Sequence, residues 1–334
     1  MSGEGGSGDS ALHVAVVVIG RNEGLRLERC LRSVSGQAAA LIYVDSGSTD
    51  CSVSMARSCG ALVVELDARE PFTAARARNL GFAAVRESFP SLEFVQFVDG
   101  DCEVVAGWLT EAASFLAAHE DVAVACGRRR ERYPEASVYN RLCDIEWDTP
   151  IGEARACGGD ALMRSVALAS VGGFRAGMIA GEEPELCVRL RAEGWRVWRL
   201  DADMTLHDAA ITRFSQWWRR TKRSGFAFAE GADLHGRPPE RHWLREARSA
   251  QIWGVAIPAL VLAGTLAFGP RALLGLIVYP LQFVRLTGKG TGSLSTRMLK
   301  AFFLLLGKFP EAAGALSFIG GRLVGQRARL IEYK

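Results

Sequence analysis

Short apolar runs alternate with amphipathic segments along the first 100 residues of the chain. The runs are rich in Val, Ile and Phe, which is typical of strands buried on both faces of a parallel sheet. In the segments between them, apolar residues recur every three or four positions, which predicts helices. Strands are predicted at 14–19, 41–44, 61–66 and 93–98, and helices at 25–34, 52–59 and 72–85. Strands and helices that alternate over short links predict right-handed βαβ units in a mostly parallel α/β sheet.

The pattern is sparser from residue 150 to residue 220. A helix is predicted over 181–193, and Pro184 suits its first position, which places Glu183 just ahead of the helix N-terminus. Glycines at 158–159 and 172–173 predict loops that pass close to a ligand or to backbone. Two short strands at 195–200 and 204–206 are then predicted, followed by His207 and by a helix that begins near Phe214.

Two long apolar segments, 252–268 and 272–284, flank Gly269-Pro270-Arg271. With 17 and 13 residues, they fall at or below the length that crosses a bilayer as a helix. A re-entrant or interfacial hairpin and two tilted spans both fit this pattern. Shorter apolar pieces at 298–307 and 312–319 follow, interrupted by Lys308-Phe309-Pro310.

The formal net charge of +3 hides an asymmetry, because Lys and Arg outnumber Asp and Glu by 19 to 6 from Arg213 onward. A basic segment interleaved with apolar runs favours an anionic membrane surface as partner, and runs of this length argue against nucleic acid. We therefore predict a flexible leader at 1–10, a catalytic α/β domain at 11–210, amphipathic interfacial helices at 211–250 and a membrane-associated helical region at 251–334.

The eight cysteines form no Cys-x-x-Cys pair, which predicts reduced and mostly buried thiols in a cytosolic domain. The first ten residues are rich in Gly and Ser and lack both a basic start and an apolar core, so no signal peptide is predicted.

Candidate chemistry gathers where the predicted strands end. Asp45 follows the second strand, and Asp99-Gly100-Asp101 follows the fourth. If the chain stays extended past Val98, Asp99 and Asp101 face one spot, at the edge where open α/β sheets bind ligands. Two carboxylates there suit Mg²⁺ or Mn²⁺ held together with substrate phosphates. A plain Asp-Gly turn between strands would give the same residues.

Three further features suggest chemistry, and each has a structural alternative. Arg78 on the third helix is placed to reach a phosphate, although a solvated helix arginine also fits. Glu183 beside a helix N-terminus would be held ionised, as a general base requires, although an ordinary charged first turn also fits. The adjacent Trp217 and Trp218 among Arg and Lys suit a membrane interface or a platform for a sugar, or simple packing.

Six segments, in their order and spacing, resemble the family 2 glycosyltransferases of the membrane-associated bacterial type. These are inverting enzymes with the nucleotide-sugar-binding GT-A fold, a Rossmann-like sheet with flanking helices. The six segments lie within 14–207 and are Ile19-Gly20-Arg21-Asn22-Glu23, Val44-Asp45-Ser46-Gly47-Ser48-Thr49-Asp50, Arg78-Asn79-Leu80-Gly81, Asp99-Gly100-Asp101, the stretch 158–174 and Glu182-Glu183-Pro184-Glu185-Leu186. The stretch 216–220 also resembles the Gln-x-x-Arg-Trp element of the processive synthases.

The resemblance implies a donor side and an acceptor side. On the donor side, Asp45 would contact the base or ribose, Asp99 the ribose or metal, and Arg78 the phosphates. Asp101 would bind the metal that bridges the diphosphate. The implied catalytic base is Glu183, which matches the second acid of the family's Glu-Asp pair. The remaining implied residues are Glu23 on the donor side and Glu182, Gln216, Trp217 and Arg219 on the acceptor side.

The chain also departs from the family pattern. Ser46 stands where the family often has a second Asp, so the nucleobase is left open. The base is Glu rather than Asp, with Pro184 after it, and the synthase element ends in Arg220 rather than Trp. The large transmembrane bundle of a processive synthase is missing, which favours transfer of a single sugar.

The predicted function is therefore metal-dependent, inverting transfer of one sugar from a nucleotide-sugar donor. The acceptor is predicted to be a hydroxyl of a lipid-linked or glycan molecule at the cytoplasmic face of the inner or plasma membrane, in cell-envelope polysaccharide biosynthesis. Two alternatives remain: a polyprenyl-phosphate sugar synthase, and a catalytically inactive scaffold at the membrane surface. The donor sugar, the pathway and the oligomeric state are left open.

Overall fold

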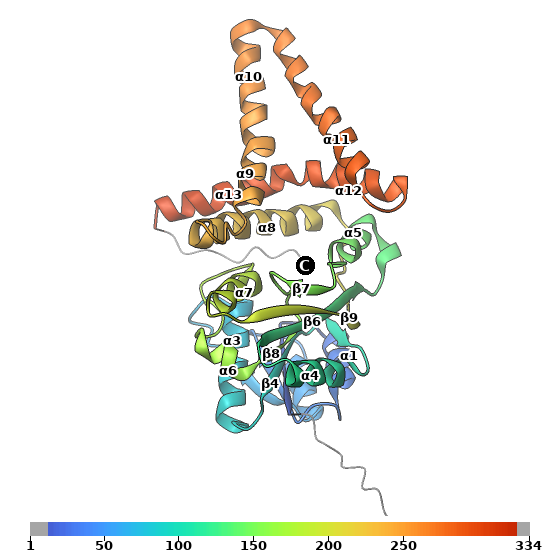
Figure 1. Ribbon diagram of the computed structural model, residues 1–334, viewed down its shortest axis with the longest axis vertical. Coiled ribbons are helices and arrows are strands. Elements are labelled where there is room, and N and C mark those ends of the chain that lie inside the picture. Colours follow the sequence, from blue (N-terminus) through green and yellow to red (C-terminus); the bar gives the residue numbers. More distant parts are fainter. Residues whose placement is uncertain (1–12, 326–334) are drawn as a thin grey trace, which may run out of the picture. The chain divides into compact units, whose positions relative to one another are not determined.

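The computed structural model describes residues 13–325, so the predicted leader at 1–10 lies outside the described residues. A nine-stranded mixed sheet with flanking helices forms the first part of the molecule (Figure 1). Its strands are β1 Val14–Gly20, β2 Ala40–Asp45, β3 Leu62–Glu65, β4 Phe94–Asp99, β5 Cys102–Val104, β6 Val122–Glu131, β7 Gly152–Ala154, β8 Ala161–Arg164 and β9 Arg196–His207. The four predicted strands before residue 100 and the mainly α/β architecture are confirmed.

The sheet changes character along its width. Strands β3, β2, β1 and β4 lie side by side in that order and are all parallel, which makes a Rossmann-like half. Beyond β4, strand β8 is antiparallel, and β6, β9 and β5 follow it, with β7 paired to β9. The chain order reverses at β1, which lies between β2 and β4. Such a reversal is the point where open α/β sheets bind ligands.

The register fixes what lies at this edge. Gly20 at the end of β1 pairs with Asp45 of β2, and Ile19 pairs with Asp99 of β4. At the far side of the sheet, His207 at the end of β9 pairs with both Cys102 of β5 and Glu131 of β6. Strand ends far apart in the sequence are thereby brought to two neighbouring parts of the sheet.

The helices alternate with the strands in the first half and dominate the second half. Those before residue 200 are α1 Leu25–Val34, α2 Ser52–Ser58, α3 Ala74–Ser88, α4 Trp108–Ala118, α5 Val138–Glu146, α6 Ser165–Ser170 and α7 Glu182–Ala192, with a 3-10 turn at Pro134–Ala136. The later ones are α8 Phe214–His235, α9 Leu244–Gln251, the π-helix Ile252–Ala256, α10 Ile257–Phe268, the 3-10 helix Pro270–Ile277, α11 Val278–Lys289, α12 Leu294–Leu306 and α13 Lys308–Leu323.

Close packing in the core explains one residue of the Arg78-Asn79-Leu80-Gly81 segment. The β1 strand is buried on both faces, with Val14 to Val18 fully inaccessible. A Cβ on Gly81 of α3 would collide with Val17 of β1 and press against Val44 of β2. The glycine therefore lets α3 lie directly on the sheet, and Arg78, one turn earlier, is carried to the sheet edge.

Three details differ from the sequence predictions. The two short strands predicted between residues 195 and 206 are one continuous strand, β9. Helix α7 begins at Glu182, so Glu183 and Pro184 lie inside its first turn rather than Glu183 ahead of it. Proline is tolerated there because the first amides of a helix have no intrahelical acceptor. The segment 294–323 continues as helix through Pro310 for the same reason, with Gly307 as the only non-helical residue of that stretch.

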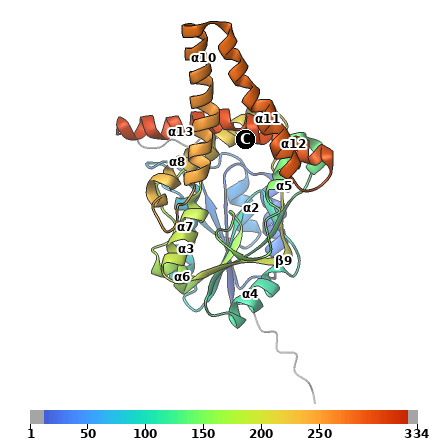
Figure 2. The same ribbon diagram turned by 45° about the horizontal axis from the view of Figure 1, so that its top comes forward.

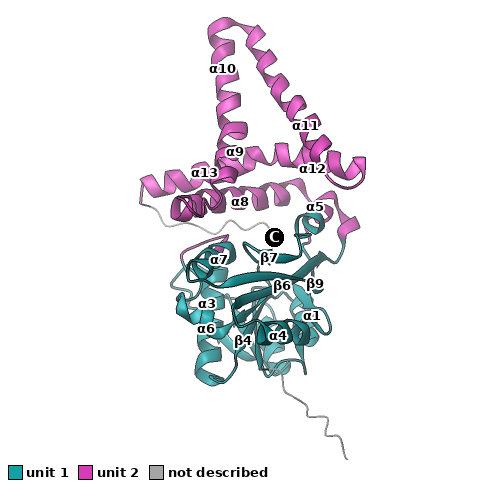
Figure 3. Cartoon of the chain, in the orientation of Figure 1, with its two compact units in different colours: residues 1–133, 143–176, 183–209 teal, residues 134–142, 177–182, 210–334 magenta. Residues whose placement is uncertain are grey.

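The chain divides into two compact units, shown in teal and magenta in Figure 3. The first comprises residues 1–133, 143–176 and 183–209 and contains the sheet. The second comprises 134–142, 177–182 and 210–334 and is helical. The predicted boundaries took no account of the two short segments before residue 183 that belong to the second unit.

Within the second unit, α10 and α11 form a helical hairpin, seen from two directions in Figures 1 and 2. Helices α8 and α13 pack against each other through glycines, because a Cβ on Gly225 would overlap the backbone of Glu311 and one on Gly314 the backbone of Lys222. Two helical stretches of the described chain, 244–268 and 294–323, are long and apolar enough to cross a membrane by length and composition.

Candidate active site

The loops that follow β1 and β2 are tied together by hydrogen bonds. The Asn22 amide donates to Ser48 Oγ at 2.9 Å, and Asn22 Oδ1 accepts from the Thr49 amide at 2.7 Å. The Gly24 amide donates to Asp50 Oδ2 at 3.2 Å. Asn22 itself has a φ of 55°, a conformation that asparagine tolerates better than most residues. The two loops, 20–24 and 46–50, therefore form one polar rim at the carboxyl ends of β1 and β2.

Asp45 is buried beneath this rim. Its Oδ1 accepts from the Tyr43 hydroxyl at 3.0 Å, and its Oδ2 accepts from the amides of Gly47 and Ser48 at 2.9 and 2.8 Å. Burial and the nearby carboxylate raise the pKa of Tyr43, so the phenol stays a donor. The carboxylate expected to contact the nucleotide thus organises the loop that follows it, and its role toward a nucleotide stays a prediction.

Glu23 lies over the ends of β1 and β4. Its carboxylate pairs with Arg26 at 2.7 Å, and its Cγ is close to the place a Cβ would occupy on Gly20 or Gly100. Larger residues at either glycine would press on Glu23, which explains the two glycines at these strand ends.

Asp99, the last residue of β4, is held by two arginines. Arg78 Nη2 lies 2.9 Å from Oδ1, and Arg129 Nη2 lies 2.8 Å from Oδ2. Although desolvation opposes ionisation, the two guanidiniums outweigh it and lower the pKa of Asp99. The strand continues past Val98 to Asp99, and the chain then turns at Gly100 and Asp101 before β5 begins. The condition under which Asp99 and Asp101 would face one spot, an extended chain through both, is therefore not met.

Arg78 links Asp99 to Glu183. Its Nη1 lies 2.8 Å from Glu183 Oε1, and the arginine side chain is only 2 % exposed. Sequence reasoning gave Arg78 a phosphate as partner, whereas the structure gives it two carboxylates. An ion pair with a guanidinium favours the ionised carboxylate, which is the form a general base needs.

Close packing explains Gly159 but not Gly158, which has open space around it. A Cβ on Gly159 would lie 2.9 Å from Asp99 Oδ2, 3.0 Å from Arg78 Nη2 and 3.3 Å from Glu183 Oε1. The loop therefore lies close to three charged side chains, and the predicted approach to a ligand stays a prediction.

Asn79 fixes the second glycine loop. Its side-chain amide donates to the Phe174 carbonyl at 2.7 Å and accepts from the Phe174 amide at 2.8 Å. The ring of Phe174 in turn packs edge-on against Phe97 and lies under the Arg78 guanidinium, 5.6 Å from the ring centroid. The neighbouring residues Arg78 and Asn79 thus hold a carboxylate pair and a loop, respectively.

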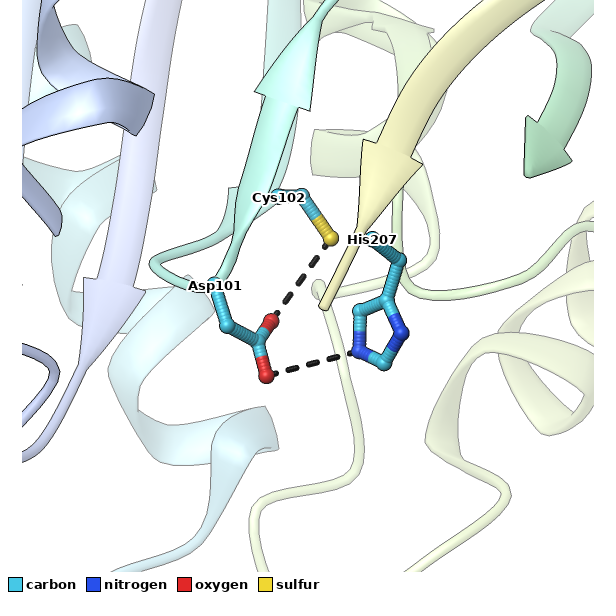
Figure 4. A group of neighbouring side chains, drawn as sticks. All are labelled: Asp101, Cys102 and His207. Atoms are coloured by element: carbon cyan, nitrogen blue, oxygen red, sulfur yellow. Dashed lines mark hydrogen bonds and ion pairs between the residues drawn. The ribbon is translucent and has the colours of Figure 1, made fainter. Parts of the chain in front are cut away.

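Figure 4 shows a group of buried donor atoms at the other side of the β4–β5 turn, made by Asp101, Cys102 and His207. His207 Nε2 lies 3.4 Å from Asp101 Oδ2, and Cys102 Sγ lies 3.6 Å from Asp101 Oδ1. Burial and the positive charge of Arg129 lower the pKa of His207, so its imidazole is neutral at neutral pH. On its far side, Nδ1 faces Glu131 Oε2 at 3.6 Å.

This donor set fits a divalent metal. The gap between the Asp101 oxygen and the His207 nitrogen is near the roughly 3 Å that separates neighbouring ligands of an octahedral ion with bonds of about 2.1 Å. A neutral imidazole and a carboxylate together suit Mn²⁺ better than Mg²⁺, which prefers oxygen alone. Cys102 is a poor ligand for Mn²⁺, because a soft thiolate suits Zn²⁺, Cu(I) or iron–sulfur clusters rather than this ion.

Asp99 belongs to a second group of donor atoms, with Cys102 and Asp160. Both of its oxygens accept from arginines, and Asp160 Oδ2 forms an ion pair with Arg129 Nε at 3.0 Å and accepts from the Thr205 hydroxyl at 2.7 Å. Groups already neutralised in this way do not form a cation site. The structure thus separates the two predicted metal ligands: Asp101 lies with His207, and Asp99 lies with Arg78 and Arg129.

Comparisons with known proteins bear on the family and the fold. Residues 15–158 match the family described as glycosyl transferase family 2. This segment is a glycosyl transferase family 2 domain. It contains Asp45, Arg78, Asp99 and Asp101 and ends just before Gly159, so that Glu183 and His207 lie outside the match.

Three relatives are informative. A TPR repeat-containing protein of Synechococcus elongatus is 31 % identical over 43 % of this chain and 34 % of its own length. The pre-mycofactocin glycosyltransferase of Mycobacterium tuberculosis is 29 % identical over 70 % of this chain and 50 % of its own length. The chain thus spans half or less of these curated relatives. The solved mannosyltransferase PcManGT of Pyrobaculum calidifontis, in complex with GDP-Man and Mn²⁺, shares the fold with a TM-score of 0.60 at 17 % identity, over 93 % of this chain and 88 % of that one.

Three residues that hold the site together were missed by sequence reasoning: Arg129, Asp160 and His207. Arg129 lies in an Arg-Arg-Arg run that looks like an exposed charge cluster, yet its guanidinium is buried between Asp99, Asp160 and the Trp147 ring. His207 offered a signal, since it ends a strand as Asp45 and Asp99 do.

The residues predicted for the acceptor side belong to the second unit and have structural partners there. Gln216 Oε1 accepts from the amides of Thr212 and Arg213 and so caps helix α8. Trp217 is buried against Tyr139 and Phe303. Arg219 is exposed and bonds to the Ser215 carbonyl, and Glu182 is buried at the start of α7. Their role toward an acceptor stays a prediction.

Proposed function

We propose that the chain transfers a single sugar from a nucleotide-sugar donor to an acceptor hydroxyl, with a divalent metal and with inversion at the anomeric carbon. The observation that carries the proposal is that Asp101 and His207, which together suit a divalent metal, lie in the same compact unit as the Glu183 carboxylate, which is paired with Arg78, and as most of the family 2 match. The solved mannosyltransferase that shares the fold was crystallised with GDP-Man and Mn²⁺, which supports a nucleotide-sugar donor and a metal.

The metal site would hold the diphosphate of the donor. A bound divalent ion there would neutralise the charge that develops on the leaving nucleoside diphosphate. Asp101 and the neutral His207 would be its protein ligands, and Glu131 would orient the imidazole from its other nitrogen. The rim formed by loops 20–24 and 46–50 would receive the nucleoside, since its amides and hydroxyls lie at the switch point of the sheet.

Glu183 would remove the proton from the acceptor hydroxyl. Arg78 keeps this carboxylate ionised and fixed in place, and Asp99 balances the other side of the guanidinium. Asp99 and Arg78 are therefore positioning residues in this scheme. Displacement by a hydroxyl activated on the face opposite the leaving group would invert the anomeric configuration.

The acceptor is proposed to be lipid-linked or a glycan at the cytoplasmic membrane face, because the second unit is basic and has two helical stretches of membrane-compatible length. The polar acceptor-side residues proposed from sequence are Glu182, Gln216, Trp217 and Arg219.

Calorimetry on the detergent-solubilised full chain tests the metal assignment. Titration with nucleoside diphosphates is expected to show binding that depends on Mn²⁺ and is lost in Asp101→Ala and His207→Ala. Asp203→Asn is the matched control, because Asp203 lies on the same strand as His207 in an exposed ion pair with Arg130. Wild-type binding by both site variants would reject the metal assignment.

A screen of nucleotide sugars for Mn²⁺-dependent hydrolysis by the same preparation would then name the donor. If the wild type binds no nucleoside diphosphate with any metal, the transferase proposal fails and the inactive scaffold replaces it.

A further inference from the structure

The segment 252–284, called here the apolar hairpin, exposes large hydrophobic side chains on all sides. Leu262, Leu266 and Phe268 on the first leg are 62, 81 and 85 % exposed, and Leu274 and Leu281 on the second are 74 and 61 % exposed. None of the residues 252–268, which form the first leg, is buried. A helix that is apolar all round, rather than on one face, suits a lipid environment better than the single contact face of a protein partner.

Two hydroxyl groups of the hairpin find acceptors within it. The Thr265 hydroxyl donates to the Val261 carbonyl at 2.8 Å, and the Tyr279 hydroxyl donates to the Trp253 carbonyl at 2.5 Å. The second of these bonds meets a carbonyl in the π-helical turn that opens the first leg. Internal satisfaction of polar groups is what a segment in hydrocarbon requires.

The two legs pack together through small residues. A Cβ on Gly264 would lie 3.1 Å from Ala272 Cβ, and one on Gly275 would lie 3.0 Å from Val261 Cγ2. Small residues at the contact between helices are the usual means of association in a bilayer, where burial of apolar area gives no driving force.

The charges around the hairpin have one sign. Residues 247–310 contain seven Lys and Arg and no Asp or Glu. Arg248 precedes the first leg, Arg285 and Lys289 follow the second, and Arg271 is the only charge between them. Basic groups at both ends of an apolar segment complement anionic lipid head groups.

The two legs are similar in length although they contain different numbers of residues. The first leg, 252–268, has 17 helical residues and is about 26 Å long at 1.5 Å per residue. The second apolar leg, 272–284, has 13 residues, but its first six are in a 3-10 helix that rises about 2.0 Å per residue. It therefore reaches about 22 Å instead of the roughly 20 Å of an α-helix.

Arg271 decides between a full crossing and a turn inside the bilayer. A hairpin that turned at mid-depth would place this guanidinium in hydrocarbon, where a charged side chain is strongly disfavoured. Legs of about 22–26 Å, extended by arginine side chains that reach the head groups, approach the roughly 27–30 Å of a bilayer core. By contrast, 294–323 carries charges at Arg297, Lys300, Lys308, Glu311 and Arg322, so no uncharged stretch in it is long enough to cross.

We propose that the apolar hairpin crosses the bilayer as two helices, with Arg271 at the surface opposite both of its ends. The inference rests on the membrane attachment in the proposed function and deepens it. Because both legs return to one surface, the chain before residue 252 and the chain after residue 284 lie on the same side.

Labelling with a membrane-impermeant maleimide tests this topology in a bacterial host. Phe268→Cys and Arg271→Cys place thiols beside and at the turn, and Thr291→Cys places one beyond the second leg. The native, exposed Cys51 reports the side of the family 2 domain in every sample. In spheroplasts, the two turn thiols are expected to label as fully as after detergent, whereas Cys51 and the thiol introduced by Thr291→Cys gain label only in inside-out vesicles or after detergent.

Two outcomes would overturn the proposal. Labelling of both turn thiols only from the side that labels Cys51 would show that the hairpin turns back inside or beside the bilayer. Extraction of the full chain by alkaline carbonate would show peripheral attachment. The calorimetric test in detergent is independent of topology, so a crossing hairpin without nucleotide binding would reject the transferase and leave this inference standing.

Discussion

The sheet edge of the first unit and the apolar hairpin of the second unit break the rules of a water-soluble domain in opposite ways. At the sheet edge, Arg78, Arg129 and Asp160 are charged and largely buried. In the hairpin, large apolar side chains are exposed and Arg271 is the only charge between the basic ends. The sheet edge thus buries charged side chains, whereas the hairpin exposes apolar ones.

The two regions are stabilised in different ways. Buried charges persist only when partners compensate their lost hydration, and the arginines and carboxylates of the site do this for one another. Exposed apolar area of the hairpin's extent is unfavourable in water and calls for another phase or partner. One region is therefore sensitive to the loss of a charge, and the other to the gain of one.

The largest effect is expected from Glu183→Gln. This variant tests whether the buried charges of the site serve catalysis as well as stability. Loss of the base should lower turnover by roughly 10²–10⁴-fold, while donor binding remains, because glutamine keeps the shape but accepts no proton. Single-turnover transfer and donor calorimetry on the same protein measure the two effects. Glu193→Gln, an exposed residue just beyond the other end of α7, is the control. Full turnover by the Glu183 variant would exclude the base and favour a phosphate acceptor, as in a polyprenyl-phosphate sugar synthase.

Arg129→Met should give the next largest effect, on stability. Removal of one partner of a buried ion pair costs about 3–5 kcal/mol, because Asp99 and Asp160 are left buried with less compensation. The midpoint of urea unfolding measures this, and Arg130→Met, which breaks an exposed pair with Asp203, should change it by about 1 kcal/mol or less. An Asp99→Asn change added to Arg129→Met should restore part of the loss. Equal midpoints for the two arginine variants would show that the buried cluster is not held by charge.

These two regions also differ in how far the sequence predicts them. Apolar periodicity located the parallel half of the sheet, because Val14 to Val18 and Phe94 to Val98 must be buried whatever else the chain does. The same holds for the hairpin, whose length and charge pattern are properties of consecutive residues. Local patterns of this kind need no knowledge of distant contacts.

The pairing inside the site was not predictable in the same way. Arg129 and Arg130 are neighbours with the same side chain, yet the Arg129 side chain is 16 % exposed and the Arg130 side chain is 52 % exposed. Strand alternation does not predict which arginine is covered, because β6 shifts register against β9 at Arg128 and Arg129, and the Arg128 side chain is covered as well. His207 reaches Asp101 only through the register of β9 with β5, over 106 positions. Sequence order alone does not fix that register, so the partners of Asp101 and Asp99 had to come from the structure.

Leu260→Lys tests the hairpin, because Leu260 lies at the middle of its first leg. In water, replacement of a leucine that is 72 % exposed should change stability by no more than about 0.5 kcal/mol, whereas at the centre of a membrane-spanning helix a lysine costs about 2.5–3.5 kcal/mol. The fraction of the chain that stays with membranes after a carbonate wash should therefore fall. Leu25→Lys is the matched control, since Leu25 is 71 % exposed on the first unit. Identical membrane fractions for both variants would show that the hairpin does not enter lipid.

The smallest effect is expected from Asp50→Asn, because Asp50 lies at the rim of the site and its side chain is exposed. Asp50 accepts from the amides of Gly24 and Ser52 at 3.2 and 3.0 Å and so joins the two loops. Partial desolvation alone would raise the pKa of Asp50, but hydrogen bonds from Ser52 and Gly24 outweigh it and lower the pKa. A carboxylate with a lowered pKa in the folded state stabilises the protein fully above its ordinary pKa of about 3.9, and that contribution is lost as the pH falls through the folded value. The difference in urea midpoint between wild type and Asp50→Asn should thus correspond to about 1 kcal/mol or less at pH 7 and shrink below about pH 4. A loss as large as that of Arg129→Met, or one that grows in acid, would show that the rim depends on charge as strongly as the buried cluster does.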